Sequence, residues 1–275
     1  MEKKKILVIG GNGKTGRKVV EGLTELGRSV RIGSRNENPS FDWENPKTWK
    51  DALEGIDSVY ITFQPDLAVP GARKAIEEFT SLAVKSRVKK LVLLSGKGEK
   101  EAELCEDVVK KSGADWTIIR ASWFNQNFSE SFFLDPIKAG QVALPKAETR
   151  IPFVDTDDIA DVAVEVLTNE KHNGKTYELT GPRQLTFKKV IEEISESTGR
   201  NIKFDSITMN EYKRLLSENN VPDDYIWLID YLFTKVLVEE NSVITNDIEK
   251  VLGREAKDFS EYVKETAETG VWDSF

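Results

Sequence analysis

Short apolar runs alternate with longer amphipathic stretches over the first 120 residues of the chain. The apolar runs predict six strands, over Lys5–Gly10, Ser29–Ile32, Phe41–Trp43, Asp57–Phe63, Lys90–Ser95 and Trp116–Arg120. Between them, helical spacing predicts helices over Thr15–Leu26, Pro46–Leu53, Pro70–Ser86 and Glu99–Lys111. Strands that alternate with crossover helices are typical of the α/β class, here a Rossmann-like, doubly wound parallel sheet.

The rhythm loosens after residue 120. The pattern there predicts helices over Asp155–Leu167 and Leu185–Thr198, a strand at Thr176–Leu179, and an aromatic-rich helical segment at Met209–Glu239. We therefore predict a core at residues 1–150 and a smaller, mainly helical C-terminal lobe at residues 151–275, interleaved with the core.

Composition and charge narrow the classes of function. The chain has 275 residues and a net charge of −8, with basic residues spread along it, which disfavours a nucleic-acid surface. No run approaches the roughly 20 apolar residues that cross a bilayer, and no signal peptide is evident, so we predict a cytoplasmic protein without a membrane partner. The single Cys105 excludes an internal disulfide and a thiolate metal cluster, and no metal is expected. The single His172 is predicted to be solvated in a surface loop. Monomer and homodimer both stay open.

Glycines at 10, 13 and 16 stand between the first predicted strand and the first predicted helix. In such a turn the first glycine permits the tight bend, the second lets the backbone approach a pyrophosphate, and the third allows close helix–strand packing. The phosphates then lie at the positive helix N-terminus, which makes Asn12, Lys14 and Thr15 candidate contacts beside the three glycines Gly10, Gly13 and Gly16. A phosphate-loop motif ending in Gly-Lys-Thr is disfavoured because Val8 occupies its first glycine position.

The end of the second strand indicates which dinucleotide binds. An NAD site usually places a carboxylate there for the ribose 2′-hydroxyl, whereas this chain has Ser34 and Arg35, and its first acid is Glu37. Arg35 suits a 2′-phosphate, with Ser34 donating beside it, so the sequence predicts NADP(H). Asp42 and Trp43 are candidate adenine contacts, although a core position for Trp43 is an equal alternative.

With these residues the chain resembles the atypical short-chain dehydrogenases/reductases of the NmrA-like kind. Within that group it is similar to the ergot-alkaloid reductases, called agroclavine dehydrogenase or festuclavine synthase, and to their bacterial relatives. The motifs that carry the resemblance are the turn at 10–16, Ser34-Arg35, Phe41–Trp43, Leu91–Ser95, Trp116–Arg120, Ser122–Asn125 and Ile151–Ala160. They cover most of residues 5–205.

The resemblance implies a Rossmann-type core, bound NADP(H) and a C-terminal lobe over the nicotinamide. By motif position, Phe63 and Gln64 border the cofactor ribose, and the segment containing Ser122 and Trp123 lies beside the nicotinamide. Ser95 matches the serine that ends the fifth predicted strand. We name Ser95 and the nearby Lys97 as catalytic candidates, and Ser95 also as a cofactor contact.

One departure from the family pattern bears on chemistry. Typical members carry a Tyr-x-x-x-Lys pair on the helix after the fifth strand, where the tyrosine acts as acid or base. The helix Glu99–Lys111 has no tyrosine. We therefore expect an acceptor that takes a hydride without a protein acid, such as an iminium or a quinone.

Two functions follow, and a purely structural role is a third, weaker possibility. The first is an NADPH-dependent reductase of a conjugated, quinone-like or iminium-like small molecule, because flat substrates stack on aromatic rings. Its candidate substrate contacts are Trp123, Phe124, Asn125, Phe128, Tyr225 and Trp227. The second is a non-catalytic NADP(H) sensor that binds a protein partner.

Overall fold

The computed structural model describes residues 4–274, which form two compact units assembled from segments far apart in the sequence. Unit 1 is Met1–Ala121, Thr156–Leu179 and Asp247–Arg254, and unit 2 is Ser122–Asp155, Thr180–Asn246 and Glu255–Phe275. The units are interleaved, but they do not divide at residue 150. The physical reason is that residues 156–179 supply a helix and an edge strand to the sheet of unit 1, while residues 122–155 join unit 2.

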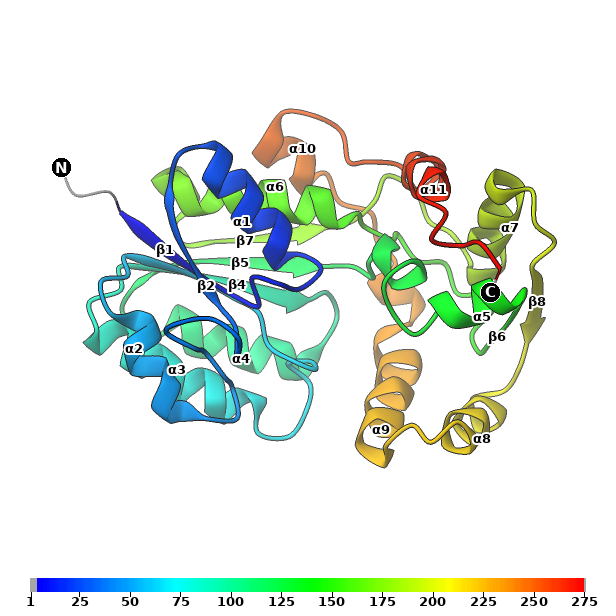
Figure 1. The fold of residues 1–275 in the computed structure, drawn as a ribbon, viewed down its shortest axis with the longest axis horizontal. Helices are drawn as coiled ribbons and strands as arrows, with labels where there is room; N and C mark the ends of the chain where they lie inside the picture. Colours follow the sequence, from blue (N-terminus) through cyan, green and yellow to red (C-terminus); the bar gives the residue numbers. More distant parts are fainter. Residues whose placement is uncertain (1–3, 275) are drawn as a thin grey trace. The chain divides into compact units, whose positions relative to one another are not determined.

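Unit 1 is built on a six-stranded sheet in the order β2-β1-β3-β4-β5-β7, with every adjacent pair parallel (Figure 1). The strands are β1 (Lys5–Ile9), β2 (Ser29–Gly33), β3 (Ser58–Ile61), β4 (Lys90–Gly96), β5 (Asp115–Ala121) and β7 (Lys175–Leu179). Since all strands are parallel, their carboxyl ends share one edge of the sheet, the edge at which α/β folds bind ligands. The predicted doubly wound parallel sheet is confirmed.

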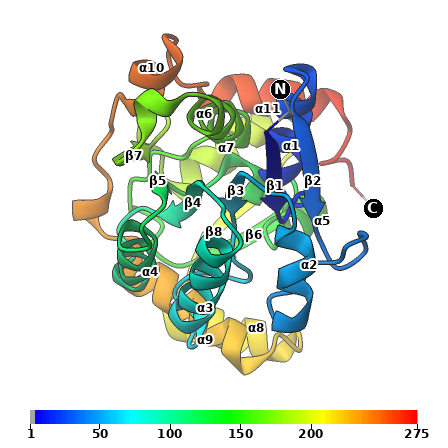
Figure 2. The ribbon, with the colours of Figure 1, turned by 90° about the vertical axis from the view of Figure 1, so that its left-hand side faces the viewer.

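Helices cover both faces of this sheet, with α1 and α6 on one face and α2, α3 and α4 on the other (Figure 2). Their bounds are α1 (Gly16–Glu25), α2 (Trp49–Leu53), α3 (Ala72–Lys85), α4 (Lys100–Lys110) and α6 (Thr156–Thr168), and α10 (Asp247–Leu252) packs beside α6. Alternation along the strands sorts the side chains between the faces. Leu91 and Leu93 of β4, for example, enter the buried cluster under α3 and α4.

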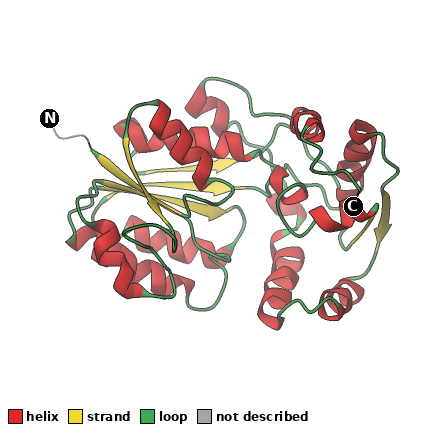
Figure 3. Cartoon of the chain, in the orientation of Figure 1, coloured by secondary structure: helices red, strands yellow, loops and turns green. Residues whose placement is uncertain are grey.

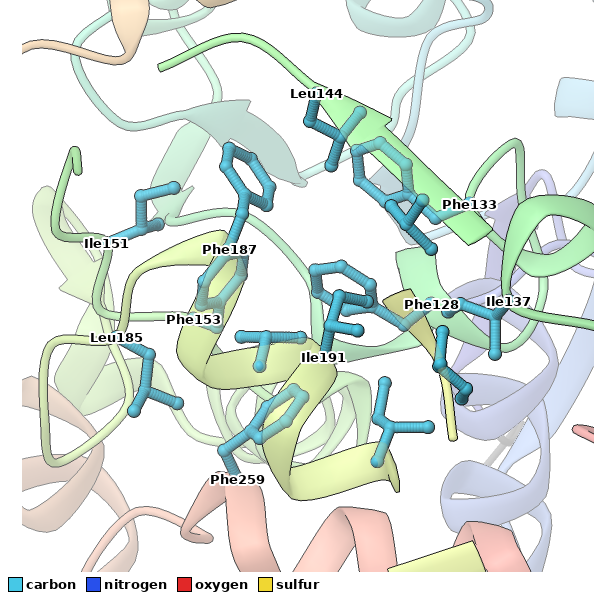
Figure 4. Close-up of a cluster of buried hydrophobic side chains, with 14 of the residues drawn as sticks. Phe128, Phe133, Ile137, Leu144, Ile151, Phe153, Leu185, Phe187, Ile191 and Phe259 are labelled. Atoms are coloured by element: carbon cyan, nitrogen blue, oxygen red, sulfur yellow. The ribbon is translucent and has the colours of Figure 1, made fainter. Parts of the chain in front are cut away.

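Unit 2 is mainly helical (Figure 3). It also carries a two-stranded parallel sheet. Its strands are β6 (Gln141–Leu144) and β8 (Lys203–Ser206), and its helices are α5 (Leu134–Ala139), α7 (Phe187–Thr198), α8 (Met209–Glu218), α9 (Asp223–Tyr231) and α11 (Phe259–Glu268). The core is aromatic: Phe128 stacks on Phe133 with ring centroids 5.0 Å apart, and Phe153, Phe187 and Phe259 surround the pair (Figure 4).

Two predicted elements differ from the structure. Phe41–Trp43 is not a strand, because its backbone amides are used locally: the Phe41 N–H donates to the Ser34 carbonyl at 2.9 Å, and the Asp42 N–H to the Thr48 hydroxyl at 3.1 Å. The segment Met209–Glu239 is broken into α8, α9 and a π-helical turn at Leu232–Val236, since Pro222 starts a new helix rather than continuing the first.

The prediction that His172 is solvated is wrong. A short 3₁₀ turn, Glu170–His172, carries the imidazole inward, and His172 is only 2% exposed. Its Nδ1 lies 2.6 Å from the Tyr177 hydroxyl and its Nε2 lies 3.3 Å from Glu165. Burial lowers the pKa of His172, against an opposing effect of Glu165, so the ring is a neutral structural group at neutral pH.

Within residues 4–274, no helix combines the length and apolar character that a bilayer crossing requires. The same residues contain no cluster of three or more histidine, cysteine, aspartate or glutamate side chains suited to hold a metal ion.

Candidate functional site

The glycine turn follows β1 at the carboxyl edge of the unit 1 sheet. Gly10 has φ +68°, a left-handed conformation that favours glycine, and its N–H donates to the Gly33 carbonyl at 2.9 Å. The Gly13 N–H then donates to the Gly10 carbonyl at 2.8 Å and closes the turn. The strand, the turn and the helix start therefore stand as the sequence predicts.

The turn leaves no room for a side chain at Gly16 and little room for one at Gly13. A Cβ at Gly16 would lie 2.0 Å from the Gly10 carbonyl oxygen, and one at Gly13 would lie 3.1 Å from the same atom. The first distance shows that α1 packs directly on the turn, as the third glycine of a dinucleotide motif requires. The helix begins without a side-chain cap from Thr15, which is buried and accepts a 3.2 Å hydrogen bond from the Tyr60 hydroxyl.

The end of β2 is tied to this turn by side chains. Asn12 Nδ2 donates to the Ser34 hydroxyl at 3.1 Å, which brings two predicted cofactor contacts together. Arg35, the next residue, is exposed, and it forms no hydrogen bond or ion pair with any residue that the structure describes. An unengaged guanidinium beside a hydroxyl is suited to bind a phosphate.

Trp43 lies in an aromatic cluster beside the end of β3. Its ring centroid is 5.1 Å from that of Phe41, 5.6 Å from Trp49 and 4.9 Å from Phe63, and its indole N–H donates to the Thr62 carbonyl at 2.9 Å. Trp43 and Phe63 are each partly buried, so Trp43 packs against the core, as one of its two predicted roles requires, and is not fully enclosed. The Asp42 carboxylate accepts from the Glu44 N–H at 3.0 Å and so orders the loop itself.

Gln64 is exposed, and its Nε2 lies 4.0 Å from the place that a Cβ at Gly13 would occupy. The predicted ribose contact is therefore adjacent to the predicted pyrophosphate contact.

The Ser95 side chain is hydrogen-bonded to a buried carboxylate of α4. Its hydroxyl donates to Glu106 Oε1 at 2.8 Å, and Arg120 of β5 donates to both oxygens of the same carboxylate at 2.8 Å each. Burial alone would raise the pKa of Glu106, but hydrogen bonds from Arg120, Lys110 and Ser95 outweigh it and lower the pKa. Glu106 is thus ionised and accepts only, so the single Ser95 proton is committed to it.

Lys97, the second catalytic candidate, is also engaged. Its side chain is only 8% exposed, and its ammonium group lies 3.6 Å from a Glu178 oxygen. Glu178 is paired in turn with Arg120 at 3.3 Å. Lys97 therefore belongs to the same charged network as Ser95 rather than standing free in a loop.

The predicted site residues of unit 2 differ in burial. Trp123 is partly buried, with its ring 5.3 Å from Phe233 and 5.9 Å from Phe187, while Ser122 is buried. Phe124 forms a backbone bridge with Val154 and stays partly accessible.

The interpretation of Phe128 as a pocket wall is corrected, because the ring is completely buried in the aromatic core. Asn125 is completely buried too, and its Nδ2 lies 3.3 Å from the Asp155 carboxylate. A carboxylate can only accept, so the Asn125 oxygen faces away from it and has no hydrogen-bond partner among the described residues.

Tyr225 and Trp227 of α9 are 47% and 46% exposed, which is unusual for large aromatic side chains. Trp227 stacks on Tyr231 with ring centroids 5.9 Å apart. These rings present an apolar surface on unit 2.

Comparison with known proteins gives the lineage of the chain. Residues 100–268 match the NmrA-like family, and residues 10–170 match an NAD(P)H-binding family. The chain belongs to the NmrA-like family. It is 31% identical to prestalk A differentiation protein A of Dictyostelium discoideum over 281 residues, which cover 96% of this chain and 93% of that protein. It is 28% identical to agroclavine dehydrogenase of Claviceps fusiformis, over 97% of this chain and 98% of that enzyme.

A solved structure supports the fold of this NmrA-like chain. The NADPH-dependent quinone oxidoreductase of Escherichia coli, in complex with NADPH, aligns with a TM-score of 0.76 at 18% identity and covers 94% of this chain and 99% of that one. The resemblance to clavine dehydrogenases expected from sequence is confirmed, and so is NAD(P)H as the cofactor class. These relationships support an NAD(P)H-dependent oxidoreductase.

Sequence reasoning about this NmrA-like chain missed Glu106 and Tyr60. Glu106 has a signal in retrospect, because a glutamate on the inner face of an amphipathic helix needs a buried cation, and Arg120 in an apolar strand is its complement. Tyr60 carries no comparable signal, since a tyrosine in a strand is common.

Proposed function

We propose that this protein is an NADPH-dependent reductase that delivers a hydride to a small conjugated acceptor, quinone-like or iminium-like. The observation that carries the cofactor choice is Arg35, exposed and unengaged by the described residues, next to Ser34 at the end of β2, where an NAD-specific site would have a carboxylate. NADPH, when bound, supplies the hydride.

The turn has the shape that a pyrophosphate needs, because its glycines leave the backbone bare where a Cβ would fill the space. The residues proposed to hold the cofactor divide by the part they bind. We assign the pyrophosphate to Gly10, Asn12, Gly13, Lys14, Thr15 and Gly16, and the 2′-phosphate to Ser34 and Arg35. We assign the adenine to Asp42 and Trp43. We assign the ribose and nicotinamide to Phe63, Gln64, Ser95, Ser122 and Trp123.

The acceptor class follows from what Ser95 cannot do. Its only proton is donated to Glu106, so Ser95 cannot also donate to a substrate carbonyl in this arrangement. The neighbouring helix α4 carries no tyrosine that would act as an acid. An iminium needs no proton when it takes a hydride, and a quinone can take its proton from water, so both suit this site.

The flat shape of such acceptors suits the aromatic side chains of unit 2. We assign Trp123, Phe124, Tyr225 and Trp227 to the substrate, with Asn125 supplying an acceptor oxygen if its surroundings open. Half-exposed Tyr225 and Trp227 support this assignment, since rings that bind no partner are normally more deeply buried.

A regulatory NADP(H) sensor is the second candidate. The commitment of Ser95 to Glu106 and the missing tyrosine favour it, because both remove a route of proton transfer. A sensor would bind the nucleotide without passing its hydride to an acceptor.

The first test is calorimetric titration of NADPH and NADH into the full-length protein. A charge-assisted contact from Arg35 contributes about 1.5–3 kcal/mol, so NADPH should bind roughly 10- to 150-fold more tightly. Arg35→Ala should remove that preference. Arg28→Ala, at the exposed opposite end of β2, is the matched control and should leave it unchanged. Equal binding of NADPH and NADH by the unaltered protein would refute the choice of NADPH.

The second test separates a reductase from a sensor. NADPH oxidation is followed by absorbance with a panel of quinones and cyclic iminium compounds, each with and without protein. Turnover that depends on both acceptor and protein supports the reductase. Nucleotide binding without any acceptor-dependent oxidation supports the sensor instead.

A further inference from the structure

The carboxyl groups of Asp66 and Glu99 lie within hydrogen-bonding reach of each other in unit 1. Asp66 lies in the loop after β3, and Glu99 immediately precedes α4 in the loop after β4. Because β3 and β4 are adjacent parallel strands, both loops stand at the carboxyl edge of the sheet. Two acidic side chains from separate loops therefore meet at this edge. If both were ionised, they could not hydrogen-bond to each other, because neither would carry a proton to donate.

The fold of the β4–α4 loop holds Glu99 in this position. Gly98 has φ +81°, a left-handed conformation that favours glycine, and Glu99 is only 8% exposed. The carboxyl group lies directly over Gly96: a Cβ there would be 2.0 Å from Glu99 Oε1 and 2.2 Å from Cδ. The missing side chain at Gly96 thus provides the space that Glu99 fills.

A hydrogen bond between two carboxyl groups requires a proton on one of them. Burial, together with the charge of Asp66, raises the pKa of Glu99 well above its usual value. The pKa of Asp66 is also raised, chiefly by burial, although the Ala68 N–H donates to its Oδ1 at 2.7 Å and favours its ionised form. Because the Ala68 N–H already stabilises an ionised Asp66, Glu99 is the better placed of the two to hold the proton between them.

Among the described residues, the charged side chains that act on the Asp66–Glu99 pair are acidic and do not neutralise it. Glu101, in the first turn of α4, adds a further negative charge beside both carboxyls. Cys105 of α4 has its sulfur 3.9 Å from the Leu67 carbonyl in the same loop, and burial raises the pKa of its thiol to about 12, so it stays neutral. Arg73, at the start of α3, acts electrostatically on Cys105. The contrast is Glu106, which has Arg120 as a direct partner and is ionised.

We propose that Asp66 and Glu99 share one proton at neutral pH and that this proton fastens the loop after β3 to the loop after β4. When it leaves at alkaline pH, two negative charges face each other inside the edge of unit 1, and the loops separate. The device is independent of which nucleotide or acceptor the protein uses.

The sign of the pH effect follows from the raised pKa. The folded protein holds a proton that the unfolded chain releases above its ordinary glutamate pKa of about 4.3. This stabilisation is therefore complete in acid and is lost as the pH rises through the pKa of the folded pair. Glutamine at position 99 donates an N–H to Asp66 at every pH, so Glu99→Gln should remove the effect without changing the shape of the side chain.

The experiment compares thermal unfolding of the full-length wild type and Glu99→Gln from about pH 5 to about pH 9. The two midpoints should agree in acid, and the wild type should fall behind by at least about 2–4 °C at the alkaline end. Glu77→Gln, an exposed glutamate on α3, is the matched control and should track the wild type throughout. A midpoint difference between wild type and Glu99→Gln that does not change with pH would overturn the proposal.

Infrared spectroscopy of the wild type supplies a readout that does not depend on how the variant folds. The folded protein at neutral pH should show the carbonyl stretch of a protonated carboxylic acid, and this band should disappear in alkali together with the loss of stability. Absence of the band at neutral pH shows that both carboxyls are ionised and overturns the proposal as well.

Discussion

Ser95 and Arg120 are directly paired across β4 and β5, and both side chains end on one carboxylate, that of Glu106. Arg120 is paired on its other side with Glu178 of β7, so three adjacent strands present a polar row beneath α4. At the centre of the row is Glu106, an ionised group that only accepts hydrogen bonds. This geometry makes Ser95 an acceptor toward any ligand that reaches it.

Removal of the Glu106 carboxylate should destabilise unit 1 strongly. Glu106→Ala leaves the partly buried Arg120 without its bidentate partner, a change that typically costs about 3–5 kcal/mol. Denaturant unfolding measures the loss. Glu103→Ala, on the same helix but half-exposed and 3.8 Å from Arg120, should cost far less. Similar losses in the two variants would show that the buried contact has no special weight.

The same carboxylate predicts a pH effect opposite in sign to that of the Asp66–Glu99 pair. Because the pKa of Glu106 is lowered in the folded protein, its contribution to stability is present above the unfolded glutamate pKa of about 4.3 and is lost as the pH falls through the folded value. Acid unfolding of Glu106→Gln should therefore show a shallower fall of stability below that pH than the wild type. An unchanged acid slope would show that other carboxylates govern it.

Alanine substitutions at two glycines of the turn should distinguish the role of the turn in helix packing from its role in nucleotide binding. Gly16→Ala places a methyl group 2.0 Å from the Gly10 carbonyl, so α1 must move and both stability and NADPH affinity should fall. Gly13→Ala meets the same oxygen at 3.1 Å, which small adjustments can relieve, so stability should change little while NADPH affinity falls. Calorimetric titration and thermal unfolding of both variants measure the two effects. Retained NADPH binding in Gly13→Ala would remove that glycine from the pyrophosphate contact.

The parallel sheet and the turn were predictable because each rests on local pattern. Continuous apolar runs indicate strands buried on both faces, and the spacing of Gly10, Gly13 and Gly16 is a backbone requirement that shows directly in the residues. The proposed role of Arg35 likewise follows from its position directly after the second predicted strand. These features depend on residues close in sequence.

Features formed by distant segments were not predictable in the same way. The burial of His172 depends on Tyr177 and Glu165, which its own polar neighbours do not reveal. A phenylalanine such as Phe128 can line a pocket or lie in a core, and the sequence does not distinguish the two. The rings packed around Phe128 in the structure show that it lies in the core. The Asp66–Glu99 pair joins two loops whose meeting depends on the sheet order.

The ion pair of Arg254 should anchor α10 to α6. Its guanidinium donates to Asp158 at 2.6 Å and contacts Asp161, and Asp158 is completely buried. Arg254→Ala removes this partner from a buried carboxylate, so the free energy of unfolding should fall by about 3 kcal/mol and amide exchange in residues 247–252 should accelerate. Arg214→Ala, whose exposed pair with Glu218 spans one turn of α8, should change stability by less than about 1 kcal/mol. Unchanged exchange in α10 would show that other contacts hold it.

Trp227 offers the most direct test of the substrate assignment, which rests on the proposed reductase activity. The side chain is 46% exposed, so Trp227→Ala should leave the unfolding midpoint within a few degrees of the wild type. If the ring stacks on a flat acceptor, loss of about 1 kcal/mol of aromatic contact should raise the KM for that acceptor roughly fivefold and leave the affinity for NADPH unchanged. Phe132→Ala, equally exposed at 45% on another segment of unit 2, is the matched control and should leave KM unaltered. A KM that rises equally in both variants, or in neither, would place the substrate elsewhere, whereas a fall in NADPH affinity would assign Trp227 to the cofactor.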